Sequence, residues 1–144
     1  MSIVRKRLEI QLEILFRFYD AHINNRKYDQ RQLNLDLKVK YTIDEINSNL
    51  SDLIGGKFIE GKIQPTRGGT APFTNRISYP GVKLVQSIID QTVPELEKVK
   101  ASDLQGADEK KKFSIFKEVW DNRQEIYKHI VPFVIEQFRE LIGS

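Results

Sequence analysis

The chain contains no cysteine, only one tryptophan and two histidines, and no long run of apolar residues. Without cysteine it can form no disulfide framework, thiolate nucleophile or cysteine-ligated zinc site, and we expect a cytoplasmic setting. No apolar run approaches the roughly 20 residues that a membrane-spanning helix needs. The opening segment has acids within its apolar stretch and lacks a small-residue cleavage site. We therefore expect neither a membrane span nor a signal peptide.

The remaining composition is that of one soluble domain of ordinary size. The chain has 144 residues, of which 40% are hydrophobic and 30% are charged. The net charge of +3 is too small to indicate a polyanionic partner by itself. The distribution of charge along the chain therefore says more about function than its total does.

Three helices are predicted in the first part of the chain, where apolar residues recur at helical spacing. The first two are expected over residues 3–24 and 28–37. A third should begin at Thr42, because Thr42 and Glu45 have the form of a capping box, in which each side chain bonds the backbone N–H of the other. The Gly55-Gly56 pair should end it, since glycine supplies the permissive backbone common at helix C-termini.

Two segments with β-branched and aromatic residues follow, over residues 58–63 and 73–79. They are separated by residues 65–72, which are rich in proline and glycine. This pattern predicts a two-stranded ribbon with a flexible tip. The predicted fold class is therefore mainly α with a small β-ribbon.

A further helix should open at Pro80-Gly81 and reach Thr92. There Thr92 and Glu95 have the form of a second capping box, which predicts a short helical turn to about residue 100. Residues 102–108 are polar and contain glycine, so they are the best linker in the sequence.

A last amphipathic helix is predicted from residue 108, and Pro132 should break or kink it before a short apolar segment over 133–142. The region is rich in aromatic residues, namely Phe113, Phe116, Trp120, Tyr127, Phe133 and Phe138. These side chains need burial, either within one chain or in a symmetric dimer. We favour a homodimer in which the first and C-terminal helices exchange contacts.

The predicted order of helix, helix, helix, ribbon and helix resembles that of a winged helix-turn-helix domain. Residues 50–59, LSDLIGGKFI, resemble a recognition helix that runs through glycine into the first wing strand. Residues 76–85, RISYPGVKLV, are similar to a second wing strand that ends in a small hydroxyl residue before a helix. Ser78 stands where such families usually have threonine.

The resemblance covers about residues 3–91 and is of the kind seen in MarR-like and PadR-like regulators, with no signature that selects one family. It places a winged helix-turn-helix domain at residues 1–91, a short helix and linker at 92–107, and a C-terminal helical segment for dimerisation or packing at 108–144.

Such a resemblance implies binding of double-stranded DNA, with the third helix in the major groove and the wing on phosphate or in the minor groove. The function expected from it is that of a transcriptional regulator that acts by occupancy. The candidate groove residues are Asn47, Ser48, Asn49 and Ser51, and the candidate phosphate or minor-groove residues are Lys38, Lys40, Lys62, Arg67 and Arg76. Residues 61–83 contain four bases and no acid, which favours an approach to phosphate.

The third helix itself has three outward acids and no base. Asp44 and Glu45 in its first turn complement the helix dipole, whereas Asp52 near its end does not. This charge keeps a second interpretation open, in which the helix binds a basic protein partner and DNA is not bound. A third interpretation, a small-ligand sensor with a cleft between the head and the tail, also stays open.

The sequence favours no enzyme. His22 and His129 have no second histidine or carboxylate at metal-ligand spacing, so we expect no metal site. Residues 67–70 contain two glycines but no following Gly-Lys-Ser/Thr, so they do not form a phosphate-binding P-loop. We expect no catalytic residue and no cofactor.

Overall fold

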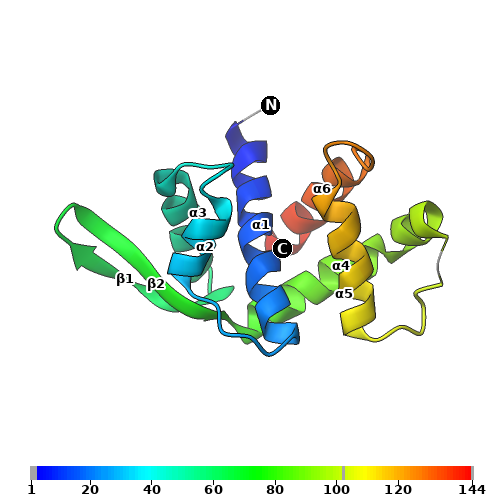
Figure 1. Ribbon diagram of the computed structural model, residues 1–144, viewed down its shortest axis with the longest axis horizontal. Helices are drawn as coiled ribbons and strands as arrows, with labels where there is room; N and C mark the ends of the chain where they lie inside the picture. Colours follow the sequence, from blue (N-terminus) through cyan, green and yellow to red (C-terminus); the bar gives the residue numbers. More distant parts are fainter. Residues whose placement is uncertain (1–2, 102, 144) are drawn as a thin grey trace. The chain divides into compact units, whose positions relative to one another are not determined.

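The computed structural model of the chain describes residues 3–101 and 103–143 (Figure 1). These residues are mainly helical, with six α-helices and one two-stranded antiparallel sheet, which agrees with the predicted class. The backbone divides into two compact units, residues 1–83 and 84–144. The sequence places its first domain boundary at residue 91, and that division stays a prediction. The predicted linker includes Ser102, which lies outside the described residues.

The helices of the first unit are α1 (Ile3–Ile23), α2 (Gln30–Leu37) and α3 (Ile43–Gly55). α2 begins later than predicted because Asp29 is its N-cap and accepts a hydrogen bond from the backbone N–H of Gln32 at 3.0 Å. The capping box of α3 is confirmed. Thr42 Oγ1 accepts from the N–H of Glu45 at 3.1 Å, and Glu45 Oε1 accepts from the N–H of Thr42 at 3.0 Å.

α3 ends at the predicted place but by a different device. Gly56 has an ordinary φ of −78°, and the left-handed residue is Lys57, with φ of 70°. The N–H of Phe58 bonds the carbonyl of Leu53, and that of Lys57 bonds the carbonyl of Ile54, both at 3.0 Å. These are the two bonds of a Schellman motif, with lysine at the position where glycine is usual. The expectation that the glycines supply the unusual backbone is therefore wrong.

The ribbon consists of β1 (Ile59–Thr66) and β2 (Gly69–Ile77), and only Arg67 and Gly68 lie between the strands. The predicted tip over residues 65–72 is therefore too long. Pro65 and Pro72 lie within the strands, because each strand of a two-stranded ribbon has one free edge where a missing N–H costs no pairing. The register shifts between Glu60 and Gly61.

α4 (Tyr79–Lys100) starts directly after the ribbon. Ser78 Oγ accepts from the N–H of Gly81 at 3.0 Å and donates to the carbonyl of Lys57 at 2.6 Å, so one hydroxyl joins the start of α4 to the end of α3. A Cβ at Gly81 would lie 1.9 Å from the carbonyl oxygen of Phe58. Glycine is therefore needed for this close approach of two backbones.

The predicted break of α4 at Thr92 is wrong. The Thr92 hydroxyl donates to the carbonyl of Ile88 at 2.7 Å within the same helix instead of capping a new one, and Pro94 lies inside α4. Val93 and Leu96 are buried on either side of this proline. Pro94 removes one backbone hydrogen bond from the helix, and the burial of these two side chains offsets that loss and favours a continuous helix.

The second unit also contains α5 (Glu109–Asp121) and α6 (Ile130–Gly143), which contact each other. The predicted helix across residue 121 is wrong, because Asn122 caps α5 and the guanidinium of Arg123 turns back over the Trp120 ring at 4.1 Å. Arg123 also donates to the Trp120 carbonyl at 2.9 Å. Pro132 lies in the first turn of α6, where no intrahelical N–H bond is lost.

Candidate nucleic-acid interface

α3 has one buried face and one open face. Ile46, Asn49, Leu50, Leu53 and Ile54 are buried, and the helix contacts α1, α2 and both strands through this side. On the opposite side, Asp44, Ser48, Ser51 and Gly55 follow one another at intervals of about one helical turn. Asp44 and Ser48 are exposed, and a Cβ at Gly55 would meet no atom within 4 Å. The open face therefore carries small or polar side chains. We call these four residues the α3 stripe.

The other two acids of α3 are paired with bases of α1. Lys6 Nζ lies 2.8 Å from Glu45 Oε2, and Arg7 forms an ion pair with Asp52. The hydrogen bond from Lys6, together with the backbone bond at Thr42, lowers the pKa of the Glu45 carboxyl. Of the three outward acids predicted, only Asp44 has no ion pair among the described residues.

Asn49 does not face outward as predicted. It is 2% exposed, its amide nitrogen donates to the carbonyl of Glu45 at 2.8 Å, and its oxygen accepts from Gln11 Nε2 at 3.2 Å. The outward assignment is wrong because the position lies on the same side as Ile46 and Leu53. Asn49 therefore ties α3 to α1 instead of offering its amide to a partner. Asn47 is half-buried at the edge of the open face, and Ser51 of the α3 stripe is also half-buried.

The predicted basic residues fall into two groups. Lys40 lies 3.3 Å from the buried carboxylate of Glu13, and Arg76 pairs across the ribbon with Glu60. Lys38, Lys62 and Arg67 are exposed and form no ion pair among the described residues 3–101 and 103–143. The free positive charge of the ribbon is therefore at Lys62 and at Arg67 of the tip.

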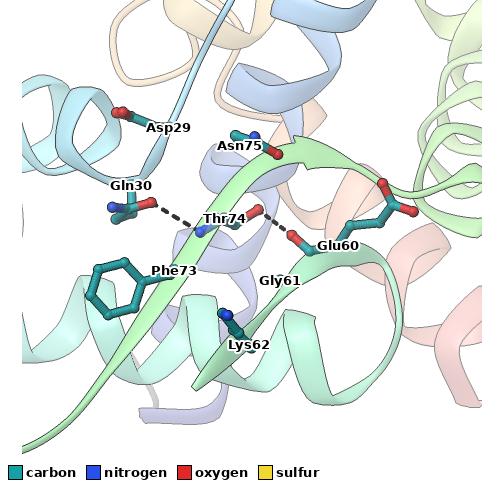
Figure 2. A pocket seen from close by; sticks show the side chains of 8 residues that line it. All are labelled: Asp29, Gln30, Glu60, Gly61, Lys62, Phe73, Thr74 and Asn75. Carbon is teal, nitrogen blue, oxygen red and sulfur yellow. Dashed lines mark hydrogen bonds between the residues drawn. The ribbon is translucent and has the colours of Figure 1, made fainter. Parts of the chain in front are cut away.

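The base of the ribbon is fixed to α2 through one glutamine. Gln30 Oε1 accepts from the N–H of Thr74 at 2.9 Å, and the Thr74 hydroxyl donates to the carbonyl of Glu60 on the neighbouring strand (Figure 2). A Cβ at Gly61 would lie 2.4 Å from the carbonyl oxygen of Phe73, so a side chain does not fit at this position. These contacts set the direction in which the ribbon leaves the helices.

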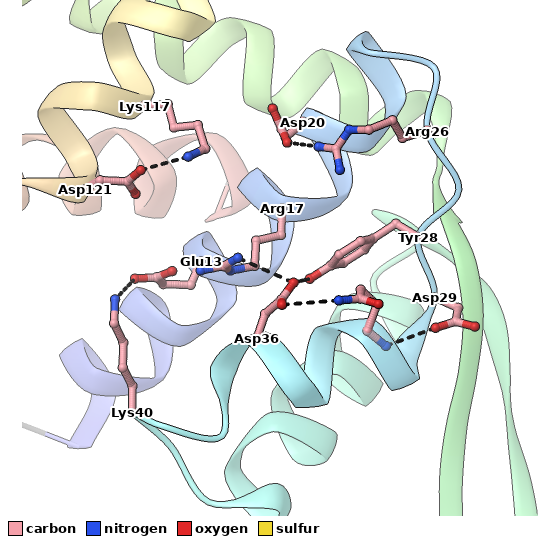
Figure 3. A network of polar contacts seen from close by, with 11 residues as sticks. Glu13, Arg17, Asp20, Arg26, Tyr28, Asp29, Asp36, Lys40, Lys117 and Asp121 are labelled. Carbon is pink, nitrogen blue, oxygen red and sulfur yellow. Dashed lines mark hydrogen bonds and ion pairs between the residues drawn. The ribbon is translucent and has the colours of Figure 1, made fainter.

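A second group of polar contacts fixes α2 against α1 (Figure 3). The Asp36 carboxylate accepts from the hydroxyl of Tyr28 at 2.7 Å and lies 3.5 Å from Arg17 Nη1. Burial of the phenol, followed by its hydrogen bond to Asp36, raises the pKa of Tyr28 above its usual value. α2 is thus fixed against α1, and both helices contact α3 and β2.

Sequence reasoning missed Lys6 and Arg7. They lie far from α3 in the chain, and the regular alternation of charged and apolar residues in α1 predicts only a solvated face. The signal that pointed to them is the unexplained Asp52, an acid near a helix C-terminus that needs a counter-charge. Its partner was not identifiable without the packing of α1 on α3.

In the described residues, no three histidine, aspartate or glutamate side chains gather in a way that would hold a metal ion. None of the described helices is long and apolar enough to cross a membrane. Comparisons with family models, curated proteins and solved structures found no match for this chain.

Proposed function

We propose that this protein is a winged-helix protein that binds double-stranded DNA and regulates transcription by occupancy. α3 enters the major groove with the α3 stripe toward the bases, and the ribbon tip lies against the sugar-phosphate backbone. The observation that supports this most is the charge around α3. Lys6 and Arg7 compensate two of its acids, while Lys62 and Arg67 on the ribbon have no acidic partner among the described residues.

The size of the side chains in the α3 stripe also favours insertion into a groove. Ser48, Ser51 and Gly55 present little bulk, so the helix backbone can approach base edges closely. Serine hydroxyls both donate and accept hydrogen bonds, so Ser48 and Ser51 can bond a base edge or a phosphate. Asn47 at the edge of the stripe can form a bidentate pair with adenine. Asn49 has no part in this role.

Phosphate contacts account for most of the affinity in this proposal. Each phosphate neutralised by Lys or Arg releases counterions, so affinity should fall with salt at a slope of about 0.9 per contact. Lys38, Lys62 and Arg67 are the free cations of the predicted set, which gives an expected slope of about 2 to 3. Lys40 and Arg76 contribute less because Glu13 and Glu60 already lie beside them.

The test is binding to a randomised duplex library, measured by mobility shift between roughly 50 and 200 mM salt. We expect salt-dependent binding that weakens in the Lys62→Ala/Arg67→Ala double variant, followed by enrichment of a defined sequence on selection. A double variant with Lys110→Ala/Lys111→Ala, two exposed lysines of α5, removes the same charge and is the control. Absence of binding at the lowest salt would overturn the proposal.

One observation favours a second candidate, a protein-interaction module. Asp44 lies at the start of the α3 stripe, is exposed, and forms no ion pair within the described residues. A basic protein segment would complement it, whereas DNA would not. The variant Asp44→Asn separates the two candidates, because it should strengthen duplex binding and weaken binding of a basic partner.

A further inference from the structure

A hollow of about 410 Å³ lies where the base of the ribbon meets the N-terminal end of α2 (Figure 2). Its lining residues are Asp29, Gln30, Glu60, Gly61, Lys62, Phe73, Thr74 and Asn75. The volume is within the range of small-molecule sites. None of the groove contacts proposed for α3 uses this hollow, and Lys62 is the one lining residue that is also a proposed phosphate contact.

One wall of the hollow combines an aromatic ring with a free cation. Phe73 is 39% exposed and pairs directly with Lys62 across the ribbon, so both side chains leave the same face of the sheet. The Lys62 ammonium forms no ion pair with any described residue. An accessible ring beside an unpaired ammonium suits a ligand that has an apolar face and a negative charge, and of the two carboxylates in the lining, that of Glu60 is already paired with Arg76.

The rest of the lining offers hydrogen-bonding groups of both kinds. The side-chain oxygen of Gln30 accepts from the N–H of Thr74, so its amide nitrogen can donate to a ligand. The amide of Asn75 forms no hydrogen bond within residues 3–101 and 103–143. Asp29 uses Oδ1 for the N–H of Gln32 and supplies a second carboxylate oxygen that only accepts.

We propose that this hollow binds a nucleotide. Its base stacks on Phe73, its phosphate lies at Lys62, and its edge meets the amides of Gln30 and Asn75 and the carboxylate of Asp29. Stacking on an aromatic side chain with hydrogen bonds to the base edge is how proteins recognise unpaired bases. Because Asp29 only accepts, it favours a base edge that donates: adenine, guanine and cytosine offer an exocyclic amine for this, whereas uracil and thymine offer only the ring N3–H.

The nucleotide can come from two sources, a free mononucleotide or an unpaired position in a single strand. A paired base does not qualify, because its edge and both faces are covered in a duplex. This site therefore adds a second binding activity to the proposed duplex binding and does not depend on it.

The test is a titration of the ¹⁵N-labelled full chain with adenosine monophosphate, followed by NMR. We expect shifts of the backbone signals of Gly61, Lys62 and Thr74 and of the side-chain amides of Gln30 and Asn75. Uridine monophosphate should bind about fivefold more weakly, because its edge offers Asp29 only the ring N3–H and no exocyclic amine. Ribose 5-phosphate has the same phosphate but no base, and equal binding of this compound would overturn the proposal.

Phe73→Leu keeps an apolar side chain but removes the stacking surface, and we expect about tenfold weaker binding of adenosine monophosphate. The matched control is Ile63→Ala, an exposed apolar residue of the same ribbon whose side chain leaves the opposite face. It should bind as the wild type does. Equal affinities of Phe73→Leu and wild type would contradict the stacking role and overturn the proposal.

Lys62→Gln should weaken binding of the mononucleotide about threefold or more, since it removes the cation beside the ring. Arg67→Gln removes the same charge from the tip, outside the hollow, and should leave this affinity unchanged. Equal losses in both variants would show general attraction to the basic ribbon and overturn the site.

A short single-stranded oligodeoxyadenylate distinguishes the two sources. Binding tighter than that of the mononucleotide, with the same loss in Phe73→Leu, assigns the site to single strands, and equal binding assigns it to the free nucleotide. Ser48→Glu serves as an independent check, because it should abolish duplex binding and leave nucleotide binding intact. Duplex binding and nucleotide binding can therefore fail independently of each other in these experiments.

Discussion

α3 and the ribbon differ in how far their charged side chains are paired within the protein. α3 has an acidic sequence, but Lys6 and Arg7 of α1 compensate Glu45 and Asp52, so most of its negative charge is balanced within the protein. The ribbon has a basic sequence, and Arg76 at its base is compensated by Glu60 while its more distant cations are not.

The difference shows that the local charge of a segment is a poor guide to the charge it presents. Over residues 61–83 the sequence counts four bases and no acid, yet Glu60 lies directly across from Arg76, and Lys83 lies in α4 and not in the ribbon. For α3 the sequence overestimates the negative charge in the same way, because two of its acids are paired with bases of α1. Once pairing is included, the positive charge of the ribbon is smaller and more localised, and α3 is nearly neutral.

The largest effect on duplex binding is expected for Ser48→Glu. It places a carboxylate in the middle of the α3 stripe, where it meets the negative field of the groove and replaces a hydroxyl. We expect a loss of at least about tenfold, from the 1–3 kcal/mol of one groove contact together with charge repulsion. Mobility shift at fixed salt measures it.

The control for this variant is Ser114→Glu, the same change at an exposed serine of α5. Both variants should melt within a few degrees of the wild type, because surface substitutions change stability by about 0.5 kcal/mol or less. Equal affinities of the two variants would contradict the role of α3.

The next effect is a difference between two arginines of the ribbon. Arg67→Gln should reduce the salt slope by about 0.9, since a free cation is lost. Arg76→Gln should reduce it by less, because Glu60 already compensates Arg76. The measurement is the slope of log affinity against log salt for each variant. A larger decrease for Arg76→Gln would show that the Glu60 pair opens on binding.

A smaller effect is expected from the pair that compensates α3. Arg7→Gln leaves Asp52 unpaired beside the groove and should weaken duplex binding about two- to threefold, as expected for an exposed charge of up to about 1 kcal/mol. The double variant Arg7→Gln/Asp52→Asn should restore binding. If it does not, Arg7 contacts the DNA directly and does not act through Asp52.

The junction between α3 and the ribbon should affect stability and leave binding unchanged. Lys57 has φ of 70°, which costs an L-residue about 1 kcal/mol and costs glycine little. Lys57→Gly should therefore raise the free energy of unfolding by up to about 1 kcal/mol, measured by urea denaturation. Gly56→Ala is the comparison: Gly56 has an ordinary φ, so no backbone strain is relieved by changing this residue. Destabilisation by more than the roughly 1 kcal/mol that glycine costs through the entropy of the unfolded chain would show that the lysine side chain has another role.

Much of the first unit was predictable because its signals are local. The capping box of Thr42 and Glu45, the helical spacing of α1 and the order of helices and ribbon all lie within short stretches of sequence. The errors occurred where one residue type fits two structures. Pro65 and Pro72 read as turn residues but occupy free strand edges, and Thr92 reads as a cap but bonds within its own helix.

The residue types of the candidate site were predictable, but which of its side chains are exposed and unpaired was not. Asn49 belongs to the buried side of α3, and Lys40 and Arg76 are compensated by acids from other segments, which no local pattern reveals. The prediction of a homodimer stays untested, but one of its reasons is weaker. Phe113, Phe116, Trp120 and Phe138 are all buried in the single chain.

The most direct test uses the absence of cysteine, which makes any introduced thiol unique. Ser48→Cys, Arg67→Cys and Ser114→Cys would each be labelled with a thiol-reactive photo-crosslinker and irradiated with the selected duplex. We predict cross-links to DNA from α3 at position 48 and from the ribbon tip at position 67, and none from α5 at position 114. Cross-links from position 114 alone, or none from position 48, would contradict the proposal that α3 and the ribbon together bind double-stranded DNA.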